Sequence, residues 1–559
     1  MPKVTITLAL LLICSACGLP PPDSTAHPAG AAIATAHPLA TEAGFAVLDQ
    51  GGNAFDAAVA VTAALAVVEP YSSGIGGGGF WLLHRSHDGY ETMLDGRERA
   101  PLAAHRDLYL DDRGNVIPGL SVDGPLAAGI PGVPAALDHL ARHYGRLPLA
   151  ASLQPAIRLA REGFPIDEHY RRLAEFRLQP LRASPAAARQ FLVDDEVPAA
   201  GYPLRQPELA QTLVTVAERG AAGFYSGDLA QRLVAGTRAA GGIWTQEDLA
   251  DYRLVEREPI RGAYRGLRIT AAAPPSSGGV VLVSILNQLA QFARAPLDST
   301  ITRHRLIETM RRAYRDRALY LGDPDFVTMP LRRLLSAGYA REMAATVVPD
   351  RATPSTGLPG VIPQAEGPHT THFSIIDREG NRVAATLSVN YPFGSGFVPP
   401  GTGVLLNDEM DDFSAKPGIP NVYGLVGAEA NAIAPGKRML SSMTPAFVEG
   451  DGRVAILGTP GGSRIITMVL QGVLAFAEGE RAEEIVTRPR LHHQYLPDVV
   501  QLEPDALSAA ERQALQLLGH RLEVKERPWG NMQAVVWDRR SGEVEAASDP
   551  RGMGAAEVR

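Results

Sequence analysis

The 559-residue sequence contains only two cysteines, Cys14 and Cys17. This scarcity excludes a disulfide scaffold, Cys₂His₂ or Cys₄ zinc sites and iron–sulfur clusters. No later apolar run approaches the roughly 20 residues that a transmembrane helix needs. Neither an HExxH motif nor a G-x-S-x-G nucleophile elbow is present. The net charge of −8 argues against a dedicated nucleic-acid binder, because phosphate recognition requires a positive surface.

Hydrophobic residues make up 45% of the chain and charged residues 20%, as in globular proteins. Gly (56 residues) and Pro (44 residues) are both above average, which predicts many turns and ordered loops.

Residues 1–17 are typical of a secretory signal peptide: Lys3 gives a positive start, residues 8–14 are apolar, and small residues follow. Cys17 stands where a lipoprotein signal carries its lipidated cysteine; ordinary cleavage nearby is the alternative. We expect residues 18–30 to form a flexible tether. The protein is then exported, to the periplasm or the cell surface, with a lipid anchor if Cys17 is modified.

The first half of the mature chain contains strong helix signals. Residues 39–50 have helical spacing, and Asn53 is a suitable N-cap for a second helix over 54–68. The run Gly74–Gly79 that follows contains G-x-G-x-x-G spacing. A dinucleotide fingerprint follows a strand and opens a helix, whereas this run follows a helix and precedes the strand-like residues 80–83. We therefore interpret it as a site of close backbone packing.

The second half changes character. Residues 303–321 form an amphipathic helical pattern, and the turn-rich stretch 349–369 follows. Residues 372–376 and 382–389 are strand-like and flank a turn, which predicts a hairpin. A strand over 454–457 leads through a glycine pair into a helix over 465–477.

Three groups of residues could carry chemistry. Thr370-Thr371 stands at the start of a strand, as the nucleophile of an N-terminal nucleophile hydrolase would; strand propensity alone is the alternative. Glu409, Asp411 and Asp412 form an acidic cluster, which by itself is typical of a solvated loop. His492 and His493 are adjacent, so they cannot both face one metal from a regular helix or strand.

Eight segments together resemble the γ-glutamyltransferase (γ-glutamyl transpeptidase) family, and they occur in family order over nearly the whole mature chain. They are LATEAGFAVLDQGGNAFDAAVAVTAALAVVEPYSSGIGGGGF (39–80), DGRERAP (95–101), PPSSGG (274–279), RALYLGDPDF (317–326), TTHFSIID (370–377), LLNDEMDDFSAKPGIPNVYG (405–424), LSSMTP (440–445) and GTPGGSRI (458–465).

The resemblance implies an α+β fold, an αββα sandwich formed jointly by two subunits after self-cleavage. Cleavage between His369 and Thr370 would give a large subunit (31–369), ending in a processing segment (349–369), and a small catalytic subunit (370–559). The two subunits stay together as a heterodimer. No metal or organic cofactor is implied.

The resemblance also implies roles for individual residues in binding and transferring a γ-glutamyl group. Thr370 is the nucleophile, and Ser388, where many members have threonine, orients it. The oxyanion hole is formed by Gly461 and Gly462, the α-carboxylate site by Arg97, Ser441 and Ser442, and the α-ammonium site by Asn390, Glu409 and Asp412. Tyr423 lies in a segment resembling the loop that covers the pocket.

The implied reaction attacks the γ-glutamyl amide of glutathione and related donors, and passes the acyl group to water, amino acids or dipeptides. A glutaryl-cephalosporin acylase on the same scaffold is one alternative. It would not need the anionic site at Asn390, Glu409 and Asp412, because glutaryl has no α-ammonium. A non-catalytic γ-glutamyl-binding lipoprotein is the other, and it would have to lack a nucleophile, an oxyanion hole or a carboxylate clamp.

Overall fold

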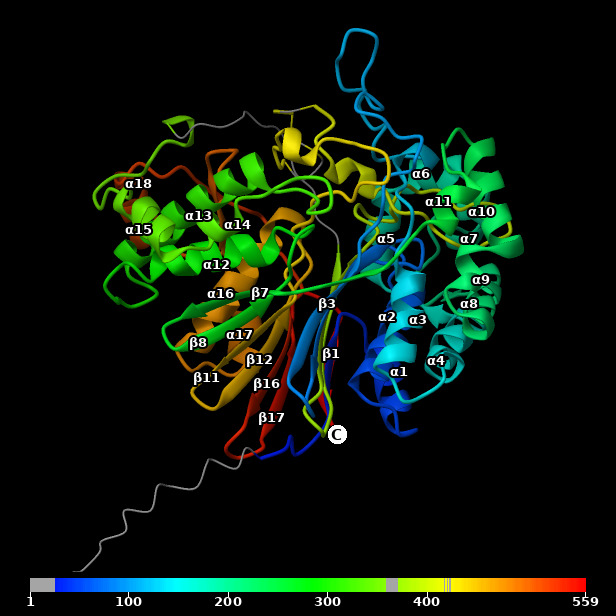
Figure 1. The fold of residues 1–559 in the computed structure, drawn as a ribbon, viewed down its shortest axis with the longest axis horizontal. Coiled ribbons are helices and arrows are strands. Elements are labelled where there is room, and N and C mark those ends of the chain that lie inside the picture. Colours follow the sequence, from blue (N-terminus) through cyan, green and yellow to red (C-terminus); the bar gives the residue numbers. More distant parts are fainter. Residues whose placement is uncertain (1–25, 358–369, 417, 420, 422–423) are drawn as a thin grey trace, which may run out of the picture.

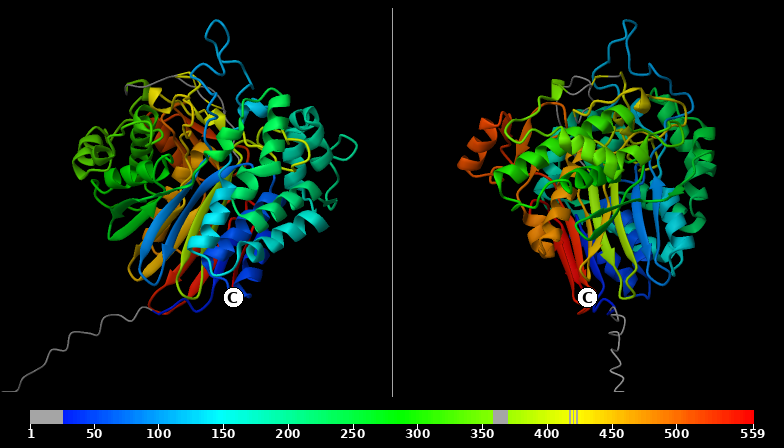
Figure 2. Two further views of the ribbon diagram at one scale, coloured as in Figure 1. Left: turned by 45° about the vertical axis from the view of Figure 1, so that its right-hand side comes forward. Right: turned by 60° about the vertical axis from the view of Figure 1, so that its left-hand side comes forward.

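The computed structural model describes residues 26–357, 370–416, 418–419, 421 and 424–559. Two antiparallel sheets pack face to face, and helices cover the outer side of each (Figures 1 and 2). This four-layer αββα arrangement confirms the expected fold class.

The larger sheet has seven strands in the order β18-β1-β9-β10-β2-β3-β6. Their bounds are β1 Ala32–Thr35, β2 Gly78–Arg85, β3 Tyr90–Gly96, β6 Val255–Arg257, β9 Thr371–Ile376, β10 Arg382–Ser388 and β18 Ala555–Val558. The central pair β9 and β10 is the predicted hairpin. Strands from the two ends of the sequence therefore lie side by side in one sheet.

The second sheet has six strands in the order β17-β16-β12-β11-β8-β7. Their bounds are β7 Ile260–Tyr264, β8 Leu267–Ala271, β11 Ala446–Gly450, β12 Arg453–Gly458, β16 Gln533–Asp538 and β17 Val544–Ser548. Two small sheets lie outside the sandwich: β13 Leu491–His492 with β14 Val500–Leu502 and β15 Leu522–Val524, and β4 Phe164–Pro165 with β5 Pro203–Leu204.

The helices divide by position in the sequence. Those of the first layer are α1 Pro38–Leu48, α2 Ala54–Val68, α3 Val133–His143, α4 Leu149–Glu162, α5 Glu168–Phe176, α6 Leu178–Ala183, α7 Pro185–Phe191, α8 Pro207–Arg219, α9 Ala222–Tyr225, α10 Gly227–Ala239 and α11 Gln246–Ala250. Those of the second are α12 Gly278–Leu289, α13 Thr300–Tyr320, α14 Leu331–Leu334, α15 Ala337–Ala345, α16 Ile465–Ala477, α17 Ala482–Thr487 and α18 Ala509–Leu517. The first layer packs on the seven-stranded sheet and the second on the six-stranded sheet.

Alternation along the strands explains why both faces of the larger sheet are buried. On β9, Phe373 and Ile375 point to the helices, whereas Ile376 joins the core between the sheets. Phe447 and Ile456 of the second sheet complete that inner core. Successive side chains of a strand point to opposite faces of the sheet. A strand that is apolar at successive positions must therefore be covered on both faces.

Local sequence signals set two important helix boundaries. The Asn53 side chain accepts hydrogen bonds from the N–H groups of Phe55 and Asp56, and the Asn53 N–H donates one to the Asp56 carboxylate. This capping box starts α2 at the predicted residue. Helix α16 likewise has the bounds predicted for it.

The glycine run before β2 packs backbone against backbone, as the sequence indicated. A Cβ atom on Gly76 would lie 2.0 Å from the carbonyl oxygen of Leu405, and one on Gly77 would lie 2.1 Å from that of Ser388. Any side chain here would push the 405–406 segment and the end of β10 away. The run therefore holds the neighbouring loops close to the sheet.

Helix α13 is less simply amphipathic than its sequence pattern suggests. Its apolar face is buried as expected, but Glu308, Arg312 and Arg317 on other faces are buried too. Glu308 is paired with Arg312 at 2.6 Å. The loops around residues 346–355 and 498 cover α13 on the side away from the sheet. Its charged side chains are therefore enclosed as well.

Among the described residues, no helix combines the length and the apolar character needed to cross a membrane. The predicted signal peptide with Cys17 and the cleavage-site residue His369 lie outside the described residues.

We predict that Gly77→Ala lowers the free energy of unfolding by about 1–3 kcal/mol, because the added Cβ overlaps the Ser388 carbonyl. The matched control is Gly338→Ala in α15, where the nearest atom to a new Cβ is 3.9 Å away. Alanine there removes unfolded-chain entropy and is expected to be neutral or stabilising by up to about 1 kcal/mol. Thermal unfolding of both variants checks this; equal midpoints would contradict the packing role.

Candidate active site

Thr370 lies one residue before β9, at the end of the sheet where β10 finishes. The β9–β10 register pairs Thr371 with Leu387, so Thr370 and Ser388 are the next facing positions. Their hydroxyl oxygens are 3.5 Å apart, and either can be the donor. The Ser388 oxygen also accepts a 2.7 Å hydrogen bond from the N–H of Asn390. A buried threonine hydroxyl is thus oriented by a neighbouring hydroxyl.

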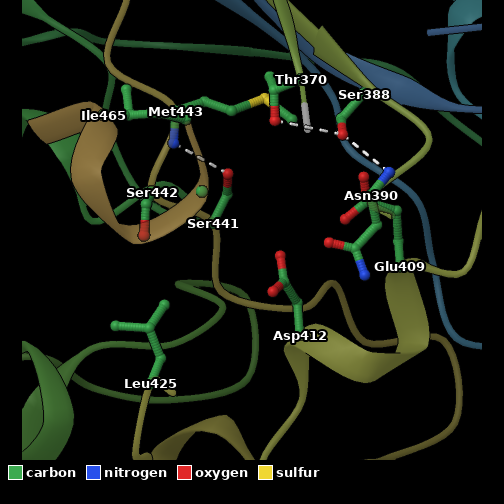
Figure 3. A pocket seen from close by; sticks show the side chains of 11 residues that line it. Thr370, Ser388, Asn390, Glu409, Asp412, Leu425, Ser441, Ser442, Met443 and Ile465 are labelled. Carbon is green, nitrogen blue, oxygen red and sulfur yellow. Dashed lines mark hydrogen bonds between the residues drawn. The ribbon is translucent and has the colours of Figure 1, made fainter. Parts of the chain in front are cut away.

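A small cavity opens beside Thr370 (Figure 3). Its volume is about 20 Å³, and it is lined by Thr370, Ser388, Asn390, Glu409, Asp412, Leu425, Ser441, Ser442, Met443, Gly462 and Ile465. The structure thus brings eight of the predicted site residues together in one place. The space holds about one water molecule.

The acidic cluster forms one wall of the cavity and is not solvated. A short 3₁₀ helix, Glu409–Asp412, carries it, and Glu409 is only 1% exposed. The solvated loop that such a cluster is typical of by itself is therefore not what the structure shows, and Glu409 and Asp412 line the cavity instead. Asn407 explains the burial, because its side chain bonds the backbone of Gly76 and Gly129 and ties the loop to the glycine run.

Arg97, directly after β3, neutralises this wall from behind. It is fully buried and donates at 2.5 Å to Glu409 Oε2 and at 2.5 Å to Asp412 Oδ2. Arg97 itself is not among the residues that line the cavity. With two carboxylates on one guanidinium, the wall is suited to a ligand ammonium group.

Burial raises the pKa values of the acids in and next to this wall. It raises the pKa of Glu409 to about 7, against the opposing charge of Arg97. It also raises the pKa of Asp412, again against Arg97 and against Arg317. Burial and the charge of Glu409 raise the pKa of Glu98 well above its usual value, which favours the neutral acid. A cationic ligand would restore the ionised forms.

The opposite wall carries two serines. Ser441 forms an isolated β-bridge with Ser276, and its hydroxyl accepts a hydrogen bond from the N–H of Met443 at 3.1 Å. The Ser442 hydroxyl accepts one from Arg317 Nη2, also at 3.1 Å. Both hydroxyl protons are therefore available to a ligand acceptor such as a carboxylate.

Arg317 of α13 is a candidate site residue that the sequence analysis did not single out. Its Nε donates to Ser277 at 2.9 Å, and the Ser277 hydroxyl donates to the Ser441 carbonyl. Within the described part of the chain it has no carboxylate partner, and burial lowers its pKa. It thus places a buried, unneutralised positive charge behind Ser442. The only sequence signal was its position at the head of the RALYLGDPDF motif.

The glycine pair after β12 forms the third side of the site. Gly461 and Gly462 have φ values of +141° and +55°, which favour glycine. No hydrogen bond from either N–H is found within the described residues. Two unpaired backbone donors beside a nucleophilic hydroxyl are suited to stabilising an oxyanion.

Another buried acid lies next to Thr370, the candidate nucleophile. Glu69, after α2, accepts hydrogen bonds from Thr371 at 2.7 Å and from Tyr71 at 3.3 Å. Burial raises its pKa to about 7, opposed by the hydrogen bonds from Thr371 and Tyr71. The sequence analysis missed this residue, because a single Glu before Pro70 shows only where the helix ends.

The histidines and acids considered as metal ligands are already engaged by other side chains. His492 bonds Thr467 and Gln494, whereas His493 bonds Asp498. His304, Glu308 and His520 are close enough together to share an ion, but Glu308 is already paired with Arg312. Tyr423 lies outside the described residues.

Comparisons with known proteins agree over almost the whole length. The family model for gamma-glutamyltranspeptidase matches residues 40–558. The chain is 43% identical to a glutathione hydrolase proenzyme of Pseudomonas sp. (strain A14) over 530 residues, 93% of this chain and 92% of the relative. It is 42% identical to the Escherichia coli (strain K12) glutathione hydrolase proenzyme, over 93% of this chain and 90% of the relative.

Solved structures give the same picture. A cephalosporin acylase from Bacillus halodurans superimposes with a TM-score of 0.84 at 30% identity, covering 98% of this chain and 99% of the other. The Helicobacter pylori gamma-glutamyltranspeptidase superimposes with a TM-score of 0.57 at 40% identity, covering 58% of this chain and 93% of that chain.

We predict that Glu69 makes stability fall with pH. Below its unfolded pKa of 4.5 both states hold the proton; between 4.5 and 7 only the folded state does, so unfolding becomes easier as pH rises. Relative to wild type, Glu69→Gln should gain on the order of 3 kcal/mol across this window. Thermal midpoints at pH 4.5 and 7.5 check this, with the exposed Glu42→Gln as control. Parallel profiles of Glu69→Gln and wild type would refute it.

Proposed function

Because the chain belongs to the γ-glutamyltranspeptidase family, we propose that it is a glutathione hydrolase and γ-glutamyltransferase that matures by cutting itself between His369 and Thr370. The carrying observation is the position of Thr370, one residue before β9 and 3.5 Å from Ser388, at the edge of a cavity with two oppositely charged walls. The full-length similarity to glutathione hydrolase proenzymes supports the same activity.

The chemistry rests on the new N-terminus that cleavage creates. The freed α-amine of Thr370 has a reference pKa of about 7.7–8.0, so it can take the proton of its own hydroxyl near neutral pH. Thr370 Oγ then attacks the γ-carbonyl carbon, and the leaving amine departs with that proton. Water or an acceptor amine next attacks the resulting ester, which frees the threonine oxygen and its proton.

Two groups assist the nucleophile in this proposal. Ser388 orients the threonine through the hydroxyl contact described above. Gly461 and Gly462 offer their unpaired N–H groups to the negative oxygen of the tetrahedral intermediate. Both glycines approach closely because no side chain intervenes.

The two walls match the two charges of the glutamyl group. The ammonium would lie against Asn390, Glu409 and Asp412. The α-carboxylate would accept hydrogen bonds from Ser441 and Ser442, and Arg317, which donates to Ser442, would supply positive charge behind them. Arg97, expected at this carboxylate, is bound instead to Glu409 and Asp412. Asp412 lines the cavity and is also bound to Arg97. Binding of a ligand ammonium at Asp412 would therefore change the strength of the Arg97–Asp412 ion pair.

The two subunits of the proposal, 31–369 and 370–559, are heavily interleaved. Strand β1 of the large part lies between β18 and β9 of the small part. The second sheet joins β11 to β8 across the same division. This pairing supports a heterodimer that persists after the backbone is cut at the end of the processing segment 349–369.

We further propose that the chain is exported by its signal segment (1–17), followed by a tether (18–30), with Cys17 as a lipidation site. Tyr423 is proposed to cover the pocket. The physiological acceptors are amino acids or dipeptides in addition to water.

A glutaryl acylase is the second candidate, favoured by the full-length likeness to the Bacillus halodurans cephalosporin acylase. Glutaryl carries the carboxylate but no ammonium. An acylase would leave the buried acids Glu409 and Asp412 without a cationic partner from the substrate, which is costly. The charge of this wall therefore favours the γ-glutamyl donor.

We predict that Thr370→Ala abolishes both backbone cleavage and turnover, because the hydroxyl is needed for each. Thr370→Ser should keep both, and Thr371→Ser is the neighbouring control that retains the bond to Glu69. Denaturing mass spectrometry should show one chain for the alanine variant and two for the others, including the 190-residue small chain. A normally cleaved Thr370→Ala protein would exclude this nucleophile.

We predict that the two walls can be separated with three anilide donors: γ-glutamyl, glutaryl (no ammonium) and 4-aminobutyryl (no carboxylate). Asp412→Asn should lower kcat/KM for γ-glutamyl by about 10²-fold and leave glutaryl nearly unaffected. Arg317→Gln should lower kcat/KM about tenfold for both carboxylate-bearing donors, but not for 4-aminobutyryl.

Completed self-cleavage in each variant shows that it has folded. Equal losses on all three donors would contradict the assignment of the walls, and a wild type that prefers glutaryl would favour the acylase.

A further inference from the structure

Glu69 is a buried acid that the proposed mechanism does not use. It lies directly after α2 and is only 4% exposed. Its carboxyl oxygens accept hydrogen bonds from the hydroxyls of Thr371 and Tyr71, and burial keeps Tyr71 neutral by raising its pKa well above the usual value. Within the described residues, no arginine, lysine or histidine forms an ion pair with Glu69. A buried carboxylate without a compensating cation is costly.

The position of Glu69 relative to Thr370 suggests where a cation could come from. Both residues line one cavity of about 210 Å³. Thr371, which donates to Glu69 at 2.7 Å, is the next residue after Thr370 in the chain. Glu69 does not line the small cavity of Figure 3, so it is separate from the walls assigned to the glutamyl group.

The other charged groups that face this carboxyl do not neutralise it. Asp167, at the start of α5, is itself acidic and raises the pKa of Glu69 further. The Arg172 guanidinium contacts the ring of His169 at 2.6 Å, and burial lowers the pKa of His169 to about 4, which leaves it uncharged at neutral pH. Arg551, the other cation of the cavity, is paired with two carboxylates.

We propose that the missing cation is the α-ammonium group of Thr370, and that Glu69 is a positioning residue that stabilises it. The proposal rests on the function proposed above, because the amine exists only after cleavage. As Thr370 Oγ bonds to the γ-carbonyl carbon, its proton passes to the α-amine, and the electron pair of the carbonyl double bond moves to the oxygen. The ammonium then gives this proton to the leaving nitrogen as the carbon–nitrogen bond breaks.

A carboxylate beside a base stabilises the cation that forms when the base takes up a proton. Glu69 thus favours proton transfer from the threonine hydroxyl and raises the pKa of the Thr370 amine. The effect is mutual, because the ammonium lowers the pKa of Glu69 from the value of about 7 that burial gives it. The pair therefore holds its charges together at neutral pH.

This role also explains why a destabilising acid is kept. The gain in stability predicted above for Glu69→Gln refers to the single, uncleaved chain, in which no cation is present beside the carboxyl. Cleavage supplies the ammonium, so the gain should be smaller in the cleaved protein than in an uncleaved Thr370→Ala background. Sites that break a rule of stability are expected where function requires it.

The test is the pH profile of the self-cleaved protein with γ-glutamyl-p-nitroanilide as the donor. In Glu69→Gln the amide oxygen still accepts from Thr371, but the charge is removed. The acidic limb of kcat/KM, where the amine becomes protonated, should move to lower pH by about one unit. We expect kcat on the plateau to fall about three- to tenfold and KM to change less than about twofold.

Two further variants separate charge from packing. Glu69→Asp keeps the charge and should keep the acidic limb within about 0.3 units of the wild type. Glu168→Gln removes an exposed carboxylate from α5, the helix beside the cavity, and is the matched control that should leave the limb unchanged.

A Glu69→Gln limb that coincides with the wild type would overturn the role. So would an uncleaved Glu69→Gln protein, or a Glu69→Asp limb that moves as far as that of Glu69→Gln. Failure of the proposed function looks different, because the wild type itself would then remain uncleaved or release no p-nitroaniline.

Discussion

The antiparallel pairing of β9 with β10 is the constraint on which the site depends. Thr370 and Ser388 are both one step past the pair Thr371–Leu387, so one register places the two hydroxyls together. A slip of one residue would turn every side chain of β9 to the other face and destroy both cores at once. Thr370 is thus held in place by the same hydrogen bonds and apolar contacts that stabilise the sandwich.

Around this pair, buried charge is the basis of the selectivity that we propose for the site. Arg97 with two carboxylates leaves one wall negative, and Arg317 without a carboxylate leaves the other positive. The protein alone does not compensate the charge of either wall, and an uncompensated buried charge is unfavourable. A ligand with one ammonium and one carboxylate at the right separation completes both, which a singly charged ligand cannot do.

Features that depend on neighbours in the sequence could be predicted well. The boundaries of α2 and α16, the β9–β10 hairpin and the packing role of Gly76 and Gly77 follow from caps, alternation and turn residues. Features that depend on distant contacts could not. The burial of Glu409 requires Arg97, more than 300 residues away, and no local pattern around Arg317 or Glu69 reveals what these residues contact.

The interleaved sheets have a consequence for the lifetime of the mature enzyme. Within one chain, the insertion of β1 between β9 and β18 is an intramolecular event. If the backbone is cut as proposed, the same pairing would have to be found by two separate molecules, and the effective concentration that the covalent link provides would be lost. Refolding would become second order, and dilution would disfavour it. Survival of the cleaved protein would then be governed by how slowly it unfolds rather than by its equilibrium stability.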